Sequence, residues 1–597
     1  MRYLLIFLFV VTLGACTNQP MVADATAEGK DDEKLSTLFN QYWEERMRLF
    51  PLEATQNGDN RYNDRLSLDI SEPFRDTLRA FYTNYLTGIQ RFDRTKLSAN
   101  DQISYDIFKR EMEMQLEGLK LNEHLIPFQQ FWGTPLTIGQ LGSGESSQPF
   151  NNAQDYRNWM SRAKTFAVWA DTAIANFKKG MVAGYVLPKP LVAKMIPQMQ
   201  DMANPDTIKN VFFGPLRHMP PAVAGDSALR NEFVTTITTT LLPAYKRLGD
   251  FLQSEYLPKA RTTTGISSVP NGAARYNYLI RYWTTTDKSA DEIYNTGLAE
   301  VKRIRGEMER IKTQVGFAGD LNAFFIHLRN DPKLMPFKTA EEVLNAFRSI
   351  QQKIEPNLNR MFGRRPKTPF EIRQTEAFRA ASASAEYQQG TADGKRPGIF
   401  YVPILDATTF NITSGMESLF LHEAIPGHHY QISLQQENES LPKFRRYSWY
   451  GAYGEGWALY TESLGKELGL YTDPYQYMGA LGDEIHRAIR LVVDVGMHVK
   501  GMTREEAIKY MMENEAISEQ GATAEIERYM AIPAQALSYK IGALKIRELR
   551  DKYTKQLGDK FNLANFHDEL LKDGVMPLDI VERKMDAWAD RIVAKKA

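Results

Sequence analysis

The 597-residue chain has very little cysteine, and this scarcity excludes several kinds of site. Its one thiol, Cys16, cannot make an internal disulfide, a zinc finger or an iron–sulfur centre. The chain also lacks net charge, because its 73 basic and 73 acidic residues balance, which argues against nucleic acid as a partner. Any metal in this protein must therefore be held by His, Asp or Glu side chains.

Long apolar runs are missing too, since no stretch after the N-terminus approaches the ~18 residues typical of a membrane-spanning helix. The apolar run from Tyr3 to Thr12, behind Arg2, is also too short to span and is typical of a cleaved export signal. Leu13-Gly14-Ala15-Cys16 resembles the lipobox of bacterial lipoproteins, in which the cysteine carries the lipid. A plain signal peptide with a chance cysteine is the alternative. Thr17, rather than Asp, follows the cysteine, which by resemblance to Gram-negative lipoproteins indicates the outer membrane, facing the periplasm.

Helical periodicity dominates the rest of the chain and predicts a mainly α fold. Six segments carry apolar residues three and four apart between charges: Leu35–Phe50, Ile103–Leu121, Ala153–Lys179, Asp291–Val315, Ala340–Met361 and Ala480–Val499. The best strand signal is Gly398–Ile404, so we expect one small β-sheet. Helix starts are predicted at Ser289 and Thr503, each with a glutamate three residues later.

A stretch rich in Pro, Gly and Thr, residues 261–272, is the best candidate for a boundary between two halves. We therefore predict four parts: a lipoprotein signal peptide over 1–15, a flexible tether over 16–32, an N-terminal helical lobe over 33–265 and a C-terminal lobe over 266–597. The C-terminal lobe holds nearly all residues that indicate chemistry.

The first such motif is LHEAIPGHHYQ, residues 421–431. Zinc peptidases use two histidines of a helix as metal ligands, and the glutamate next to the first histidine is the general base. The motif therefore makes His422 and His428 candidate zinc ligands and Glu423 the candidate base. A solvated helix end is the alternative, because a His-Glu pair alone is common.

The spacing of this motif departs from the usual four residues between histidines. His428 is six residues after His422. On a regular helix this spacing turns the side chain of His428 ~120° around the axis from that of His422, onto another face. Pro426 cannot donate a helical hydrogen bond and Gly427 tolerates unusual dihedrals, so we predict a bulge within the helix that returns His428 to the metal. His429 is the reserve ligand.

A third ligand is expected in the segment AYGEGWALYTE, residues 452–462. Glu455 and Glu462 are two turns apart and share a helix face, so one can bind the metal while the other orients a ligand histidine. The aromatic neighbours Tyr453, Trp457 and Tyr460 argue against an exposed carboxylate pair, since buried carboxylates need a cation.

Four segments, HEAIPGHHYQ, YGEGWALYTE, HRAIRLVVDVGMH and RYMAIPAQALSYKIG, together resemble the domain of unknown function 885 family. The family shows HEAxPGHHxQ, YGEGWALYxE, RxxRLVxDxGxH and RYxxxPxQALSYxxG in this order, and many members have Gly where this chain has Ala534. The resemblance continues more weakly upstream and covers most of the mature chain. The family is thought to be related to the helical zinc peptidases of the gluzincin type, such as thimet oligopeptidase and angiotensin-converting enzyme.

This resemblance implies a gluzincin-like fold of two helical lobes around a deep cleft, with the small sheet near the metal site. It implies that Glu455 is the third ligand and that Glu462 lies behind the ligands. In the gluzincin relatives a Tyr or His from a C-terminal segment stabilises the oxyanion, and the candidates here are Tyr529 and Tyr539, followed by His498.

Charged residues around these candidates suggest further roles. Arg528 is a candidate for binding a substrate carboxylate. Arg487, Arg490 and Asp494 share a helix with His498, and the four-residue spacing predicts a hydrogen bond between Asp494 and His498. A helix-surface ion network is the alternative for the charged group, and core packing is the alternative for the two tyrosines.

These expectations describe a zinc-dependent hydrolase, lipid-anchored in the cell envelope of a Gram-negative bacterium, whose substrate is a peptide or another amide. Zn²⁺ is the expected cofactor, and a membrane but no nucleic acid is an expected partner. One alternative is a zinc hydrolase of a non-peptide amide or ester. The other is a non-catalytic lipoprotein that binds peptides.

Overall fold

The computed structural model describes residues 31–375, 384–391, 394, 396–413 and 415–594. The predicted signal peptide, Cys16 and all of the predicted tether except its last two residues lie outside this part. Within the described residues, no helix is both long and apolar enough to cross a membrane.

The helical predictions are confirmed. All six periodic segments are helical, and the predicted segment Ala340–Met361 coincides with α15. Ser289 and Thr503 each form a capping box at the start of a helix, α13 (Ala290–Gln314) and α22 (Arg504–Asn514). In both boxes the hydroxyl accepts the amide of the third helical residue, while the glutamate there accepts the amide of the cap.

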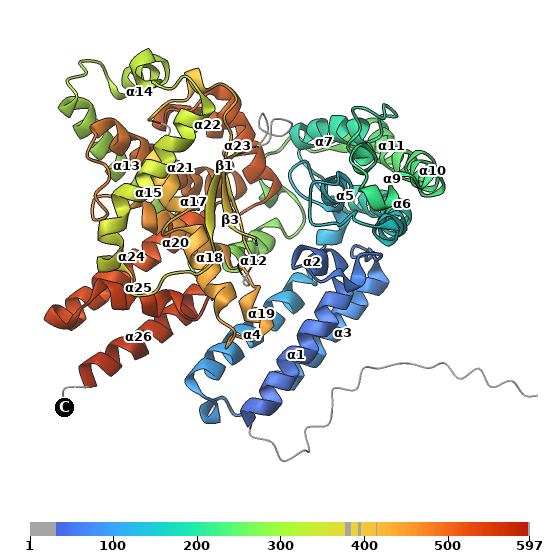
Figure 1. Cartoon of the computed structure of the whole chain (residues 1–597), viewed down its shortest axis with the longest axis horizontal. Coiled ribbons are helices and arrows are strands. Elements are labelled where there is room, and N and C mark those ends of the chain that lie inside the picture. Colours follow the sequence, from blue (N-terminus) through green and yellow to red (C-terminus); the bar gives the residue numbers. More distant parts are fainter. Residues whose placement is uncertain (1–30, 376–383, 392–393, 395, 414, 595–597) are drawn as a thin grey trace, which may run out of the picture.

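The first half of the chain forms two groups of helices (Figure 1). The first group contains α1 (Asp31–Leu49), α2 (Pro51–Gln56), α3 (Glu72–Ile89) and α4 (Ala99–Gly118). The second group contains α5 (Thr134–Gly142), α6 (Ala153–Ala183), α7 (Lys189–Met202), α8 (Gly214–Arg217), α9 (Pro221–Ala224), α10 (Ser227–Thr236) and α11 (Leu242–Phe251).

The second half forms the larger body on the left of Figure 1. Its helices before the sheet are α12 (Gly272–Thr284), α14 (Leu321–Asn330) and the helices α13 and α15 given above, whereas α22 follows the sheet. The helices after the sheet are α17 (Met416–Glu423), α18 (His428–Glu437), α19 (Lys443–Arg446), α20 (Gly451–Glu462), α21 (Pro474–His498), α23 (Glu519–Ala531), α24 (Leu537–Leu557), α25 (Leu563–Leu571) and α26 (Leu578–Ala594).

One small sheet precedes the helix that carries His422. Its strands are β1 (Phe370–Gln374), β2 (Glu386–Gln388) and β3 (Gly398–Val402), in the order β1-β3-β2. The strand β3 is the predicted one and lies in the centre, parallel to β1 and antiparallel to β2. All five of its residues are buried, as expected for a central strand covered on both faces.

The hydrophobic cores join segments that are far apart in the sequence. One core packs the helices α5–α11 against residues of α13, α14 and α21–α23. The other packs α1, α3 and α4 against the sheet, α15, α17, α20 and α24–α26. Each of the two cores thus contains residues from both sides of the predicted boundary near residue 265.

Two glycines let α20 and α24 cross with their backbones in contact. A Cβ atom on Gly542 would lie 1.8 Å from the carbonyl oxygen of Ala452, and one on Gly456 would lie 2.5 Å from the Cα of Gly542. The helix α20 carries both Glu455 and Glu462, so this crossing determines how deeply the two carboxylates enter the body.

We expect Gly542→Ala to lower the free energy of unfolding by about 1–3 kcal/mol, because the new methyl group must push α20 away from α24. The matched control is Gly306→Ala on α13, where a Cβ meets nothing within 4 Å. That control should be neutral or stabilising by up to about 1 kcal/mol, since alanine favours helix. Calorimetric melting temperatures measure both, and equal values would contradict this account of the crossing.

Candidate metal centre

The candidate metal-binding motif folds as two helices, not as the single bulged helix predicted from the sequence. The helix α17 ends at Glu423, and α18 begins at His428 after a tight turn. Pro426 lacks the amide that a continuous helix needs, and a Cβ on Gly427 would lie 1.9 Å from the carbonyl oxygen of His422. The turn therefore requires glycine, and it folds the start of α18 back toward the end of α17.

The turn brings His428 beside His422, and α20 adds Glu455. The Nε2 atoms of His422 and His428 lie 3.6 and 3.4 Å from Oε2 of Glu455. One ligand atom from each of the three residues lies within 4.8 Å of the others. Zinc takes N and O ligands at about 2.0–2.2 Å in tetrahedral geometry, which separates two ligand atoms by roughly 3.3–3.6 Å. The donor set and its spacing therefore fit a zinc ion.

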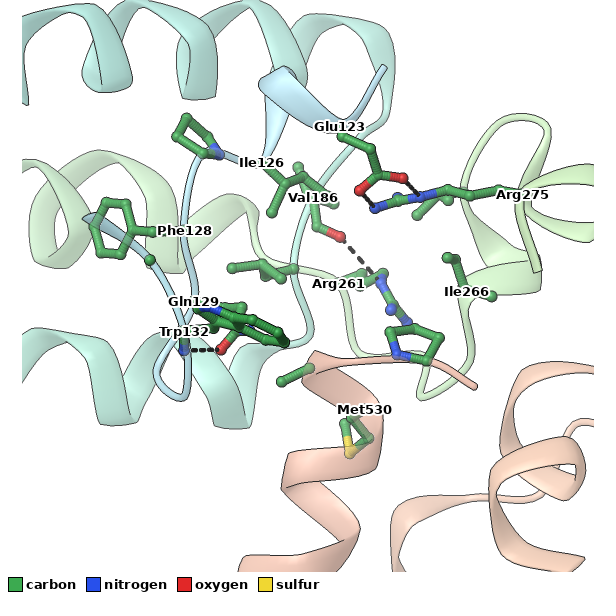
Figure 2. A pocket seen from close by; sticks show the side chains of 16 residues that line it. Glu123, Ile126, Phe128, Gln129, Trp132, Val186, Arg261, Ile266, Arg275 and Met530 are labelled. Atoms are coloured by element: carbon green, nitrogen blue, oxygen red, sulfur yellow. Dashed lines mark hydrogen bonds and ion pairs between the residues drawn. The ribbon is translucent and has the colours of Figure 1, made fainter. Parts of the chain in front are cut away.

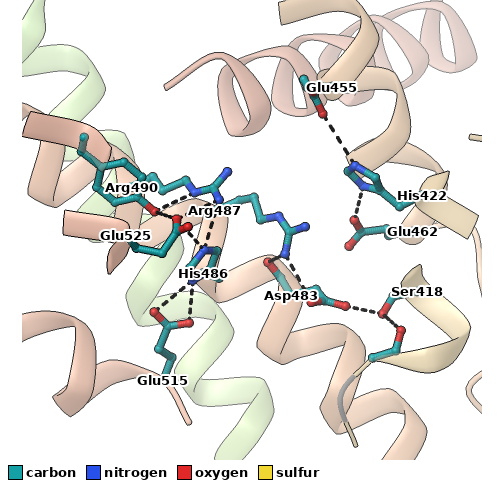
Figure 3. Close-up of polar contacts among 12 residues, drawn as sticks. Ser418, His422, Glu455, Glu462, Asp483, His486, Arg487, Arg490, Glu515 and Glu525 are labelled. Carbon is teal, nitrogen blue, oxygen red and sulfur yellow. Dashed lines mark hydrogen bonds and ion pairs between the residues drawn. The ribbon is translucent and has the colours of Figure 1, made fainter. Parts of the chain in front are cut away.

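Glu462 supports this group from behind (Figure 3). Its Oε1 lies 2.7 Å from Nδ1 of His422, so it accepts that proton and directs Nε2 toward Glu455. Burial by itself would lower the pKa of His422, but the hydrogen bonds to Glu455 and Glu462 raise it to about 10. Burial would raise the pKa of Glu455, but the two histidines hold it well below its usual range. The free chain thus keeps a proton where a metal would bind.

Glu423 lies at the end of α17, directly after His422. Burial raises the pKa of its carboxyl, and the histidines 422 and 428 offset part of this rise. A carboxylate with a raised pKa is a better proton acceptor, which is the property that a general base needs.

These residues line one pocket of about 600 Å³. Its described lining contains the three candidate ligands and Glu423, together with Ser384, Ala385, Glu386, Tyr387, Ile432, Trp449, His486, Arg487, Arg490, Glu525, Arg528 and Tyr539. Three of these are arginines, and they come from α21 and α23. The pocket therefore combines a candidate metal site with a cluster of cations.

Two predicted residues, Arg528 and Tyr539, belong to this pocket. The guanidinium of Arg490 lies over the ring of Tyr539, 4.6 Å from its centroid. The guanidinium of Arg528 lies over Phe131, which is half exposed in the loop before α5. The structure thus brings both residues into the same pocket as the candidate base.

The reserve ligand His429 turns the other way, toward the sheet. Its Nδ1 lies 3.0 Å from the hydroxyl of Tyr387, and its ring packs against Phe370 at 4.8 Å. Burial lowers the pKa of His429 to about 4, so the ring is neutral. His429 therefore joins α18 to the sheet and does not reach the candidate ligands.

His498 and Asp494 do not form the predicted hydrogen bond, and His498 is not a lining residue of the pocket. The Nδ1 of His498 accepts the amide of Ile266 at 3.0 Å, and Nε2 donates to the carbonyl of Tyr529 at 3.0 Å. Asp494 instead accepts the hydroxyl of Tyr276 and the amide of Ala534. Both side chains tie α21 to neighbouring segments, because helical spacing alone does not say which partner is closer.

Ala534 and Tyr529 explain two further sequence features. Ala534 has φ +67°, a conformation that favours glycine, which accounts for the glycine expected here in many family members.

Tyr529 is buried and donates its hydroxyl hydrogen to Glu525, while Nε of Arg490 donates to the same hydroxyl at 2.9 Å. Tyr529 therefore positions Arg490 and Glu525, and only Tyr539 of the two tyrosines lines the pocket.

Sequence reasoning missed several lining residues. The ring of Trp449 lies 5.8 Å from that of His428, and Glu525 contacts Arg490 and His486. A signal for Glu525 was present, because it precedes Arg528 and Tyr529 by three and four residues on one helix face. No local pattern marks Trp449, which reaches the pocket from the loop before α20.

A model of the family described as "Bacterial protein of unknown function (DUF885)" matches residues 51–585. A crystal structure of "the putative lipoprotein from Colwellia psychrerythraea" is 27% identical, with a TM-score of 0.86, over 94% of this chain and 100% of that one. A structure described as "a putative lipoprotein of unknown function from Shewanella oneidensis" is 19% identical, with a TM-score of 0.73, over 92% and 99% of the two chains.

A search of curated proteins finds no match. The solved structures share the fold, and the more similar one aligns over its whole length. The family resemblance that the sequence motifs indicated is confirmed by the family model, which spans all four motifs. Because this match covers far more than half of the sequence, the chain belongs to the DUF885 family of bacterial proteins of unknown function.

Proposed function

We propose that this protein is a zinc-dependent hydrolase of the bacterial cell envelope that cleaves peptide bonds, with gluzincin-like lobes flanking its active-site cleft. The observation that carries the proposal is the group formed by His422, His428 and Glu455. Its three N and O ligand atoms lie within 4.8 Å of one another, in the same pocket as Glu423. A zinc ion held there would supply a Lewis acid for the attacking water and the scissile carbonyl.

The chain's own residues supply the proton transfers. Glu423 takes a proton from the attacking water and later delivers it to the leaving nitrogen. Glu462 keeps the proton of His422 on Nδ1, so that Nε2 remains available as a ligand. Tyr539 lines the pocket and is our candidate to donate a hydrogen bond from its hydroxyl to the developing oxyanion.

A location in the cell envelope is supported by the N-terminus and by the structural relatives. The lipobox-like Leu13–Cys16 would provide a lipid anchor, and the two similar structures are described as lipoproteins. We propose that the lipid holds the protein at the outer membrane, facing the periplasm, with peptide substrates reaching the pocket from that compartment.

Replacing Glu423 by Gln should leave zinc binding intact and lower kcat by about 100-fold or more, because the base and proton shuttle are lost. Glu455→Gln is the matched variant, since it changes the same chemical group on a candidate ligand. It should lose zinc as well as activity. Metal content by plasma mass spectrometry and turnover of a quenched-fluorescence peptide library measure the two effects.

Two results would contradict the proposal in different ways. A chain that neither carries nor binds zinc would indicate a non-catalytic peptide-binding protein. A zinc-loaded chain that leaves the peptide library intact but cleaves small amides or esters would indicate a hydrolase of non-peptide substrates.

Zinc affinity should fall as the pH falls from 8 to 6, by about tenfold per pH unit for the single proton of His422. The pKa of His422 in the free chain is about 10, so the proton is bound throughout this range and zinc must displace it. Calorimetric titration with zinc in buffers of different ionisation enthalpy counts the protons, and about one should be released at pH 7. Binding without proton release would contradict a protonated Nε2 of His422 in the free chain.

A further inference from the structure

The pocket that holds the candidate metal ligands also holds three arginines with unused donors. Nε of Arg487, Nη1 of Arg490 and Nε of Arg528 are buried, and none has a hydrogen-bond partner among the described residues. A buried donor that stays unpaired on a charged group is more costly than one on a neutral group, because the charge has lost its hydration. Three such donors in one pocket call for an acceptor that arrives with a ligand.

Arg490 is the most buried of the three, with 5% of its surface exposed. Its other nitrogens are held by Tyr529 at 2.9 Å and by Glu525 at 3.1 Å, while its face rests on the ring of Tyr539. The guanidinium is thus fixed from three sides, and Nη1 is the donor left over. A side chain held this firmly loses little entropy when it binds a ligand.

Arg487 lies one helical turn before Arg490 on α21. Figure 3 shows it between the group formed by Arg490, His486 and Glu525 and the pair formed by His422 and Glu462. Its Nη1 donates to Asp483 at 3.2 Å, and its Nε is unused. Arg487 therefore connects the arginine cluster to the candidate metal site.

Carboxylates pair with part of each guanidinium in this cluster. Arg490 and Arg528 contact Glu525, and Arg487 contacts Asp483. The carboxylates of Glu462 and Glu423 also act on Arg487 from the side of the candidate metal site. Within the described part of the chain, the three donors named above remain unpaired beside these contacts, so they, and not a net charge, favour a ligand that brings an acceptor.

A second pocket of the molecule contains two arginines that hydrogen-bond to acceptors of the protein, and it serves as a comparison (Figure 2). There Arg275 makes two hydrogen bonds to the carboxylate of Glu123, and Arg261 donates to the carbonyl oxygens of Val186 and Thr263. Both guanidiniums have acceptors within the protein. Single buried Nε atoms without a partner among the residues that the structure describes also occur on Arg75 and Arg445, which do not line the pocket with the candidate metal ligands. That pocket differs in that three arginines with an unused donor line it together.

We infer that the arginines 487, 490 and 528 bind a carboxylate of the substrate. This inference rests on the proposed function and narrows its substrate class to peptides that place a carboxylate near the scissile bond. The carboxylate is either the C-terminus of the peptide or an acidic side chain. The planar guanidinium fork suits both, since it pairs with the two oxygens of a carboxylate.

The test measures binding separately from hydrolysis. The zinc-loaded full chain with Glu423→Gln, in detergent, is titrated with three peptides: N-acetyl-Ala-Ala-Phe-Ala, its C-terminal amide, and the amide of N-acetyl-Ala-Ala-Asp-Ala. We expect at least one carboxylate peptide to bind about tenfold or more tightly than the uncharged amide. If only the peptide with a free C-terminus binds tightly, the arginines recognise the C-terminal carboxylate. If the Asp peptide binds tightly, they recognise an acidic side chain.

Substitutions assign the effect to the arginines. In Arg487→Gln and Arg528→Gln the preference for carboxylate should fall to about threefold or less. Arg490→Lys keeps the charge but loses the fork, and should weaken the preference as well. Arg275→Gln removes the same charge from the pocket in Figure 2 and should leave the preference unchanged. The side chains of Arg487 and Arg528 are less buried than that of Arg490, so we expect their glutamine variants to fold. These two variants decide the test if Arg490→Lys does not fold.

Failure of this inference differs from failure of the proposed function. Equal binding of all three peptides, or a preference that survives in both glutamine variants, overturns the carboxylate site even if the wild-type chain cleaves peptides. A carboxylate preference that disappears in those variants supports the site even if no peptide is cleaved.

Discussion

The burial of two carboxylates beside His422 is the constraint on which the rest of the site depends. Glu462 is buried and Glu455 is partly buried on α20, so water stabilises the charge of both carboxylates poorly. The free chain compensates with a proton on His422, and a divalent cation would compensate more fully. The backbone contact between Gly456 and Gly542 brings α20 this deep, so helix packing and electrostatics are coupled. A change in either would leave an unpaired charge in the interior.

The pocket has two chemically different parts that lie on different elements. The candidate metal ligands come from α17, α18 and α20, whereas the arginines come from α21 and α23. Glu423 and Tyr539 line the same pocket as both parts. A substrate anchored at the arginines would therefore have its reactive bond limited to a few positions. This restriction is the usual means by which binding energy at a remote group is converted into rate.

Several polar residues next to the pocket act through other residues. His498 joins α21 to the segment at Ile266 and to the end of α23, and Asp494 joins it to Tyr276 and Ala534. Tyr529 holds Arg490 and Glu525 in place. These bonds are buried, and each satisfies donors and acceptors that would otherwise be costly. They explain why a motif rich in His, Asp and Tyr need not consist of catalytic groups.

Local physics made much of this protein predictable from its sequence. Helical periodicity identified all six examined helices, and the capping boxes at Ser289 and Thr503 needed only neighbouring residues. The motif predicted that His422 and His428 come together, whereas the choice of Glu455 over Glu462 as their partner came from the family resemblance. The tertiary structure alone decided that α17 ends in a turn, that His429 faces the sheet and that His498 binds backbone. It also decided that three arginines keep unused donors. Spacing along a helix determines which side chains share a face, whereas the partner of a buried polar group depends on segments that meet only when the chain packs.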